Sequence, residues 1–123
     1  MTQAKEITSD IVKAEEVIGV DVQNAKGEDL GTINTLVLDK RAGFVRYVVL
    51  SFGGFLGMGD KLFALPWEIL SYNEARDCFV LDIPQEKLKN APGFNKNQWP
   101  NMSDRKWGES IFNYYGSRPY WQK

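Results

Sequence analysis

The sequence predicts an all-β fold, a small six-stranded antiparallel barrel, followed by a C-terminal helical extension rich in aromatic residues. Six short segments with strand-like patterns follow one another at a spacing of about 8–12 residues, and turn-forming residues separate them. No strand pattern alternates with a long helical pattern, so a parallel βαβ sheet is not expected. The length of 123 residues suits a single domain.

The first two strands are predicted after a polar start. Residues 1–13 are mostly polar and are expected to be flexible. Residues 10–16 can form one or two helical turns, and apolar and polar residues then alternate over 18–23, as in a half-buried strand. A polar turn leads to a second strand over 31–38, and residues 39–43 predict another turn.

The third strand, over residues 44–53, is the strongest strand signal in the chain. It is rich in β-branched and aromatic residues, and both of its faces are apolar apart from Arg46 and Ser51. Strands that are apolar on both faces are usually covered on both faces. We therefore expect one face to line the barrel interior and the other to be covered by a helix, the tail or a partner.

The remaining strands are predicted over 61–65, 67–72 and 78–83. Pro66 cannot donate a hydrogen bond to a sheet and therefore marks a bend between the first two of them. Pro84 suits the start of a short helix that continues to about Asn90. Together, residues 14–90 are predicted to form the barrel domain.

Residues 91–123 are predicted to be a separate C-terminal extension with one helix at about 104–115. Asp104 can cap the start of this helix and Gly116 can end it. Gly108 in its middle costs about 1 kcal/mol of helix stability, so tertiary packing must hold the helix. Its apolar stripe consists of Trp107, Ile111, Tyr114 and Tyr115.

Several kinds of chemistry are not expected from the composition. The chain has no histidine, and its lone cysteine, Cys78, lies in a predicted strand as a buried thiol. We expect no catalytic residues, no bound cofactor and no metal site, and therefore no enzymatic activity. No stretch reaches the ~20 apolar residues of a membrane helix, and the N-terminus lacks a signal-peptide pattern, so a cytoplasmic location is expected.

The glycine-rich loop over residues 53–60 can be compared with a phosphate-binding loop. Gly54 and Gly59 have the required spacing, but Asp60 stands where the lysine should be, and a strand follows instead of a helix. A nucleotide site is therefore not expected. The apolar residues of the loop can either fold back over the barrel mouth or contact a partner, and these residues are Phe55, Leu56 and Met58.

The same loop carries a family resemblance. The segment 53–61, followed by 65–67, resembles the PRC-barrel signature, as do 18–22 and 30–33 with Gly27 between them. This family is named after the cytoplasmic domain of the photosynthetic reaction centre H subunit, and a related barrel forms the C-terminal domain of a ribosome maturation factor. The resemblance covers about residues 14–90. It implies a six-stranded β-barrel that binds proteins, and it brings no catalytic residues.

The charge is distributed unevenly along the chain. Residues 1–86 carry 8 Lys and Arg against 14 Asp and Glu, whereas residues 87–123 carry 7 against 2. The same final segment holds 8 of the 16 aromatic residues. A basic, aromatic extension is therefore expected to lie on an acidic barrel, either in the same chain or exchanged with a second chain.

These observations predict a non-enzymatic protein–protein interaction module, a homodimeric scaffold or regulatory adapter that dimerises through its extension and binds a further protein. One alternative is an RNA-associated or ribosome-associated assembly factor, although the acidic barrel disfavours nucleic acid. Another is a small-ligand-binding barrel with a pocket under Trp67 and the glycine loop. The candidate interaction residues are Phe55, Leu56, Met58, Trp67, Trp99, Trp107, Ile111, Tyr114, Tyr115 and Trp121.

Overall fold

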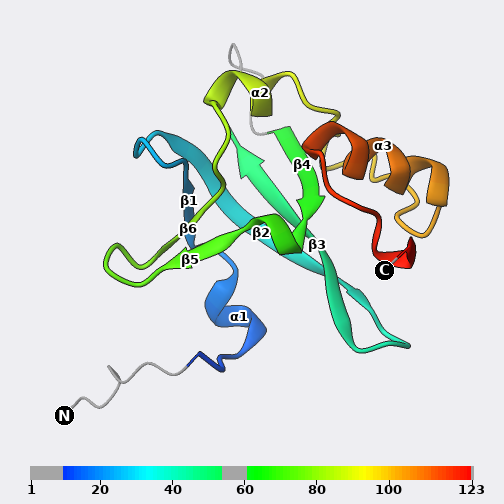
Figure 1. Cartoon of the computed structure of the whole chain (residues 1–123), viewed down its shortest axis with the longest axis horizontal. Helices are drawn as coiled ribbons and strands as arrows, with labels where there is room; N and C mark the ends of the chain where they lie inside the picture. The colour runs from blue at the N-terminus through cyan, green and yellow to red at the C-terminus, as the bar shows by residue number, and fades with distance from the viewer. Residues whose placement is uncertain (1–9, 54–60, 123) are drawn as a thin grey trace.

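The computed structural model describes residues 10–53 and 61–122 (Figure 1). These residues form a six-stranded sheet with the strand order β4-β3-β2-β1-β6-β5. Short helices flank the sheet, and the longest of them, α3, belongs to the C-terminal extension. The elements in chain order are α1 (Ala14–Val17), β1 (Asp21–Gln23), β2 (Asp29–Asp39), β3 (Phe44–Phe52), β4 (Lys61–Pro66), the 3-10 helix η2 (Trp67–Ile69), β5 (Ser71–Asn73), β6 (Cys78–Val80), α2 (Gln85–Lys89), α3 (Arg105–Tyr115) and the 3-10 helix η3 (Tyr120–Gln122).

The long hairpin of β2 and β3 forms the centre of the sheet. Its antiparallel register pairs Ile33 with Leu50 and Leu36 with Val48. These aliphatic side chains fit a pleated surface, and complete burial of each stabilises the fold by about 1.5–3 kcal/mol. The hairpin thus supplies the middle of the main core, whose buried members are Val17, Val22, Leu30, Ile33, Val48, Leu50, Phe52, Phe63, Leu65, Leu81, Leu88 and Ala91.

The six predicted strands are present, but the sheet is mixed and not closed, which corrects the antiparallel barrel expected above. β1 runs parallel to β6, with Val22 beside Phe79. Within the described ranges, β4 and β5 lie at opposite edges of the sheet and no ladder joins them. The parallel pair arises because the chain crosses from the β4 edge to the other edge before the β5–β6 hairpin returns beside β1 (Figure 1).

The strand predicted over 67–72 is shorter in the structure. Pro66 precedes the 3-10 turn of η2, and only Ser71–Asn73 forms the strand β5. Because Pro66 has no N–H group, the β4 ladder ends there and the chain turns. The β4 edge is partly covered by the extension, since Leu62 and Phe94 exchange two backbone hydrogen bonds of 2.9 Å.

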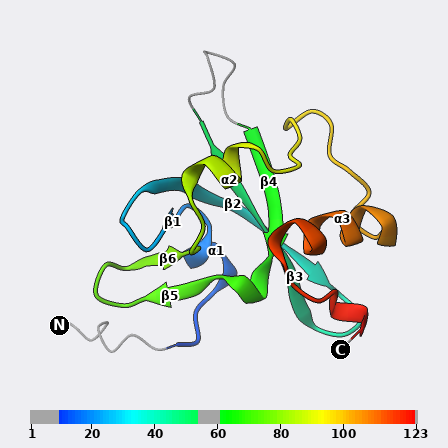
Figure 2. The ribbon, with the colours of Figure 1, turned by 45° about the horizontal axis from the view of Figure 1, so that its top comes forward.

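The predicted helix of the extension is present as α3, with the predicted caps. The Asp104 carboxylate accepts a hydrogen bond from the Lys106 N–H at 3.0 Å. Gly116 ends the helix with φ of 70°, a left-handed conformation that glycine adopts without strain. Figure 2 shows α3 running beside β3 and β4, away from the β5–β6 hairpin.

The extension covers the outer face of the central sheet, as the two apolar faces of the third strand led us to expect. Tyr47 packs against Ile111 and Phe112 of α3. Val49 forms a second cluster with Leu62 and Ala64 of β4, and the extension also covers this cluster. One face of β3 therefore points to the main core, and the other points to the chain's own C-terminal segment.

Candidate functional site

The sequence-predicted interaction residues fall into three groups. Phe55, Leu56 and Met58 of the glycine loop lie outside the described residues. Trp67 opens η2, where it is half-buried against the main core and meets the Phe79 ring at 5.8 Å between centroids. The third group belongs to the extension, and most of its members contact the chain's own sheet.

Trp107, Ile111 and Trp121 pack inside the chain. The Trp107 ring meets the Tyr47 ring edge-on at 5.0 Å, and Ile111 is completely buried. Trp121 packs against Phe112 with 5.9 Å between ring centroids. In this arrangement these residues fix the extension on the sheet, and Ile111 offers no surface to a partner.

Tyr114 and Tyr115 connect α3 to the main core. The Tyr114 hydroxyl donates a hydrogen bond of 2.6 Å to the Lys87 carbonyl in the middle of α2. The Lys87 ammonium also lies 5.2 Å from the centre of the Tyr114 ring. The Tyr115 hydroxyl is buried without a hydrogen-bond partner among the described atoms, and desolvation raises the pKa of Tyr115.

Trp99 is the most exposed of the predicted aromatic residues that the structure describes. Its side chain is 45% exposed, although its ring packs on Phe94 at 4.8 Å and its indole N–H donates to the Lys96 carbonyl at 2.9 Å. This aromatic pair lies along the β4 edge, in the irregular segment before α3. It is therefore an ordered surface ring that could contact a partner.

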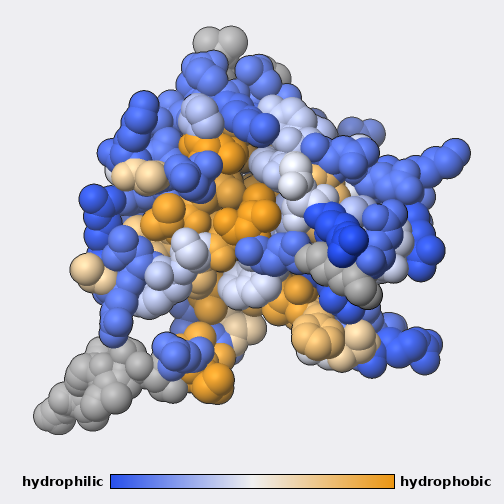
Figure 3. Space-filling view, in the orientation of Figure 1, coloured by the Kyte–Doolittle hydropathy of each residue, from blue (hydrophilic) through white to orange (hydrophobic). Residues whose placement is uncertain are grey.

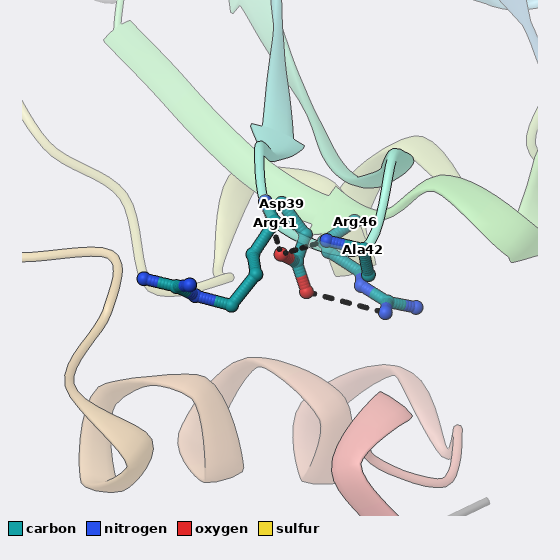
Figure 4. Close-up of polar contacts among 4 residues, drawn as sticks. All are labelled: Asp39, Arg41, Ala42 and Arg46. Atoms are coloured by element: carbon teal, nitrogen blue, oxygen red, sulfur yellow. Dashed lines mark hydrogen bonds and ion pairs between the residues drawn. The ribbon is translucent and has the colours of Figure 1, made fainter.

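The best-developed surface site lies elsewhere, at the tip of the β2–β3 hairpin. Asp39 organises the turn, because its carboxylate accepts hydrogen bonds from the Arg41 N–H at 3.1 Å and the Ala42 N–H at 2.9 Å. The other carboxylate oxygen meets the Arg46 guanidinium at 3.3 Å. The Ala42 hydrogen bond and Arg46 together hold the pKa of Asp39 below its usual value. Figure 4 shows Arg41 and Arg46 extending to opposite sides of Asp39.

Arg46 belongs to a row of arginine and aromatic side chains in contact with one another. Its guanidinium lies 4.9 Å from the centre of the Phe44 ring and 4.3 Å from the centre of the Tyr120 ring. Tyr120 contacts Trp121 edge-on at 5.0 Å, and the Arg105 guanidinium lies 5.3 Å from the Trp121 ring. We call these five residues the arginine–aromatic row. Each cation–ring contact contributes about 0.5–1 kcal/mol at an exposed site, so the row attaches the hairpin to the extension.

The hairpin also leaves large apolar side chains in solvent. Leu38 is 63% exposed and Phe44 is 61% exposed, one on each side of the turn. The turn between them carries Lys40 and Arg41. We call Leu38, Lys40, Arg41 and Phe44 the hairpin end. It combines apolar surface with positive charge, and Figure 3 shows apolar surface along this part of the molecule.

The strand patterns of the sequence do not distinguish the hairpin end from other strand residues. Leu38 and Phe44 continue ordinary strand patterns, and nothing in a strand pattern tells how far the covering layer extends. The one available signal was their position beside the tight turn at 39–43, because residues next to such a turn can extend beyond the neighbouring strands and stay exposed. A register shift between Val37 and Leu38 also turns the end of β2 relative to the strand before it.

The described residues also line a cavity of about 300 Å³ between the β1–β2 turn and the start of α2. Its wall includes Asn24, which is buried and uses its whole amide: it donates to Glu28 and the Ile83 carbonyl and accepts from the Lys26 and Glu28 N–H groups. The hydrogen-bonding groups of Asn24 are thus all used within the fold. None of the residues that line this cavity belongs to the pocket expected under Trp67.

Two features that the described residues lack bear on the chemistry of the site. No group of three or more carboxylates or thiols in residues 10–53 and 61–122 is placed to hold a metal ion. No helix formed by these residues has the length and apolar character to cross a bilayer. The site's chemistry therefore comes from its arginines, its rings and its exposed aliphatic surface.

Comparison with known protein families identifies the domain. Residues 9–88, more than half of the chain, match the PRC-barrel domain. The match includes the hairpin end and stops before the extension. A search among curated proteins finds no match.

Proposed function

The chain belongs to the PRC-barrel family, and from this premise we propose that it is a non-enzymatic protein–protein interaction module that binds through its hairpin end. The observation that carries the proposal is the pair of exposed apolar side chains, Leu38 and Phe44, beside the arginine–aromatic row. Exposed apolar side chains that gather with arginine and aromatic residues are typical of protein contact sites.

The hairpin end is held in place before a partner arrives. Arg46 contacts the Phe44 ring, and its own position is fixed by Asp39 and by Tyr120. A side chain that is already ordered loses less conformational entropy on binding, a cost of about 0.5–1.5 kcal/mol for each mobile side chain. The ordering of Phe44 therefore favours its use as a binding residue.

The extension acts as a support in this proposal. Tyr120 belongs to η3, and its contact with Arg46 brings the last residues of the chain to the β2–β3 hairpin. The family match ends at residue 88, so the support comes from outside the matched domain. In the proposed function, the common scaffold supplies the hairpin and the extension of this chain determines how it is presented.

Homodimerisation through the extension stays a prediction. In the single chain, the extension packs onto its own sheet through Trp107 and Ile111. The same contacts would form between two chains that exchanged their extensions. The proposed binding role of the hairpin end is compatible with either arrangement, because the extension supports the hairpin in both.

The proposal is tested by site-specific photocrosslinking in the native cell. A photoreactive amino acid at position 44 should produce covalent adducts with protein, whereas the same group at the exposed position Glu74, in the turn between β5 and β6, should produce far fewer. Adducts at both positions in equal yield, or none at position 44, would contradict the proposal. Adducts with RNA in place of protein at position 44 would also reject it.

RNA or ribosome association is the second candidate function. Guanidinium groups over aromatic rings, as at Arg46 and Arg105, are also used by proteins that bind single-stranded nucleic acid. The 14 carboxylates of residues 1–86 oppose a polyanion, and Asp39 pairs with Arg46 itself. This function requires a salt-sensitive RNA complex that weakens when basic residues are neutralised, namely Lys87, Lys89, Lys96, Arg105 and Lys106.

A further inference from the structure

A second exposed apolar surface surrounds α1 and has the opposite charge to the hairpin end. Val12 is 51% exposed and Ile18 is 43% exposed, and Ile11 beside them is 86% exposed. Glu15 and Glu16 belong to the same helical turn, and the Glu16 carboxylate accepts a hydrogen bond from the Lys13 N–H at 3.0 Å. We call Ile11, Val12, Glu15, Glu16 and Ile18 the α1 end. Figure 3 shows apolar surface there as well as along the hairpin.

The local structure explains why these aliphatic side chains remain outside. The helix α1 has only four residues, and it buries a single side chain, Val17. The chain after it is fixed to β2, since the Gly19 N–H donates to the Ile33 carbonyl at 2.7 Å. A one-turn helix fixed in this way can place one residue in the core, and its apolar neighbours are left in solvent.

The two surfaces carry opposite net charge. Residues 10–21 contain four acidic residues and one basic residue, whereas residues 38–46 contain three basic residues and one acidic residue. At the α1 end, Lys13 lies 3.7 Å from Glu15, but both side chains are mostly exposed, so this pair is weak. At the hairpin end, Asp39 is already occupied by Arg46 and the turn, which leaves Lys40 and Arg41 as the outward charges.

We propose that the hairpin end of one copy of this chain docks on the α1 end of a second copy, and that the contact is repeated reciprocally to form a two-fold symmetric dimer. The inference rests on the proposed function and names its partner. Leu38 and Phe44 would pack on Val12 and Ile18, with Lys40 and Arg41 facing the carboxylates. Opposite charge around matching apolar surface is the arrangement that directs association and sets the register of an interface.

The positions of the two surfaces permit this symmetry. In Figure 1 both α1 and the β2–β3 hairpin project from the lower side of the sheet. A two-fold axis between two such molecules brings each hairpin end to the other molecule's α1 end, so each favourable contact occurs twice. Two separate contacts can together reach the roughly 1,200–2,000 Å² that a stable interface buries.

The test uses the full chain in sedimentation equilibrium. The unmodified chain should form a dimer, and Arg41→Glu or Glu15→Lys should each weaken it about tenfold, because every reversed charge meets a like charge twice per dimer. The variant that carries both changes should dimerise again, because the reciprocal pairs are then restored with exchanged signs. Lys96→Glu and Glu74→Lys, which alter exposed charges elsewhere, should leave dimerisation unchanged.

A further substitution tests the apolar part of the proposed contact. Phe44→Ser should weaken the dimer on the order of 100-fold, since two rings are removed from the interface. Tyr72→Ser, which removes another exposed ring, is the matched control. Thermal unfolding followed by circular dichroism checks that both variants are folded. If Phe44→Ser does not fold, the dimer proposal is judged on Arg41→Glu, Glu15→Lys and the variant that carries both changes.

Several outcomes would overturn the dimer. A chain that stays monomeric at about 1 mM would do so, as would a dimer that is indifferent to Arg41→Glu and Glu15→Lys. A monomer that binds vesicles of anionic phospholipid through Phe44 would assign the hairpin end to a membrane surface instead. If the chain is monomeric but position 44 crosslinks to a different protein in the cell, the interaction function stands and only the second copy is rejected.

Discussion

The hydroxyl of Tyr47 on β3 lies against Gly108 of α3, so closely that a Cβ atom at residue 108 would be 2.8 Å from the Tyr47 oxygen. The Trp121 ring also lies 2.8 Å from the same Cβ position. The missing side chain at residue 108 thus lets the helix approach the sheet and the end of the chain. Gly108 lowers the intrinsic stability of α3, but the packing of α3 against Tyr47 and Trp121 requires a residue without a side chain at this position.

Gly108→Ala is predicted to destabilise the protein although alanine favours helix. The gain in helix propensity is about 1 kcal/mol, whereas an added group in a packed interior typically costs about 1–3 kcal/mol. We expect a net loss of about 1 kcal/mol in the free energy of unfolding, measured by urea denaturation. Ser110→Ala, at an exposed position of the same helix, is the control. An increase in stability on Gly108→Ala would show that the ring positions adapt freely.

Tyr47→Phe is predicted to stabilise the protein slightly and to relieve the Gly108→Ala penalty. The Tyr47 hydroxyl is buried without a hydrogen-bond partner among the described atoms, and its burial raises the pKa of Tyr47. Removing an unsatisfied buried hydroxyl should raise the free energy of unfolding by about 1 kcal/mol. A double-mutant cycle with Gly108→Ala should show coupling of about 0.5–1 kcal/mol. Independent, additive effects would contradict the contact.

Gly31→Ala is predicted to be much more damaging than a comparable change at Gly19. Gly31 has φ of 102°, and a Cβ atom there would overlap the backbone carbonyl oxygen of Ser51 on β3. Because backbone cannot move aside as a side chain can, we expect a loss of at least about 3 kcal/mol. Gly19 has φ of 91° but open space around it, so Gly19→Ala should cost about 1–2 kcal/mol from backbone strain alone. Equal losses in chemical denaturation would argue against the close approach of β2 and β3.

The Asp39 turn predicts a specific response to acid. The Ala42 N–H and Arg46 lower the pKa of Asp39 in the folded state, so its ionised form stabilises the fold above the unfolded-state pKa of 3.8. That contribution should disappear as the pH falls through the lower, folded-state value. NMR titration should place the Asp39 midpoint below 3.8. Asp39→Asn should reduce stability at neutral pH and make little difference at the acid end, and a constant difference across pH would count against the linkage.

Much of the local structure could be predicted from the sequence. Asp104 and Gly116 mark the ends of α3 because capping depends on residues within one turn of each other. The alternation of side chains and the turn at 39–43 located β2 and β3 for the same reason. The apolar composition of both faces of β3 also predicted a cover on its outer side, which the extension provides.

The errors concern partners that are far apart in the chain. The pairing of Val22 with Phe79 makes β1 and β6 parallel, and no local pattern specifies the direction in which a distant strand returns. The strand predicted over 67–72 began too early, because the turn after Pro66 uses residues that also suit a strand and only Ser71–Asn73 forms β5. Strand propensity reflects packing and burial, which the tertiary structure sets.

At the candidate site, too, local patterns were predictable and contacts between distant segments were not. Trp107 and Ile111 were predicted as interaction residues for their apolar stripe, but a stripe does not tell whether its cover is another protein or the same chain. Leu38 and Phe44 lie in ordinary strand patterns, and their position beside the turn at 39–43 was the one signal of exposure, because strand residues become a surface feature only when the neighbouring layer ends before them. The contact of Arg46 with Tyr120 joins residues that are distant in the chain, and no sequence pattern predicts it.

The helix caps, the number of strands, the family and the basic, aromatic extension beside an acidic domain were all predictable from the amino acids. These properties depend on neighbouring residues or on composition. The tertiary structure alone decided that the sheet is mixed and open, that Tyr47 meets Gly108, and that the hairpin end remains exposed. The physical reason is that burial depends on the sum of contacts from all elements, and it is fixed only when distant segments pack together.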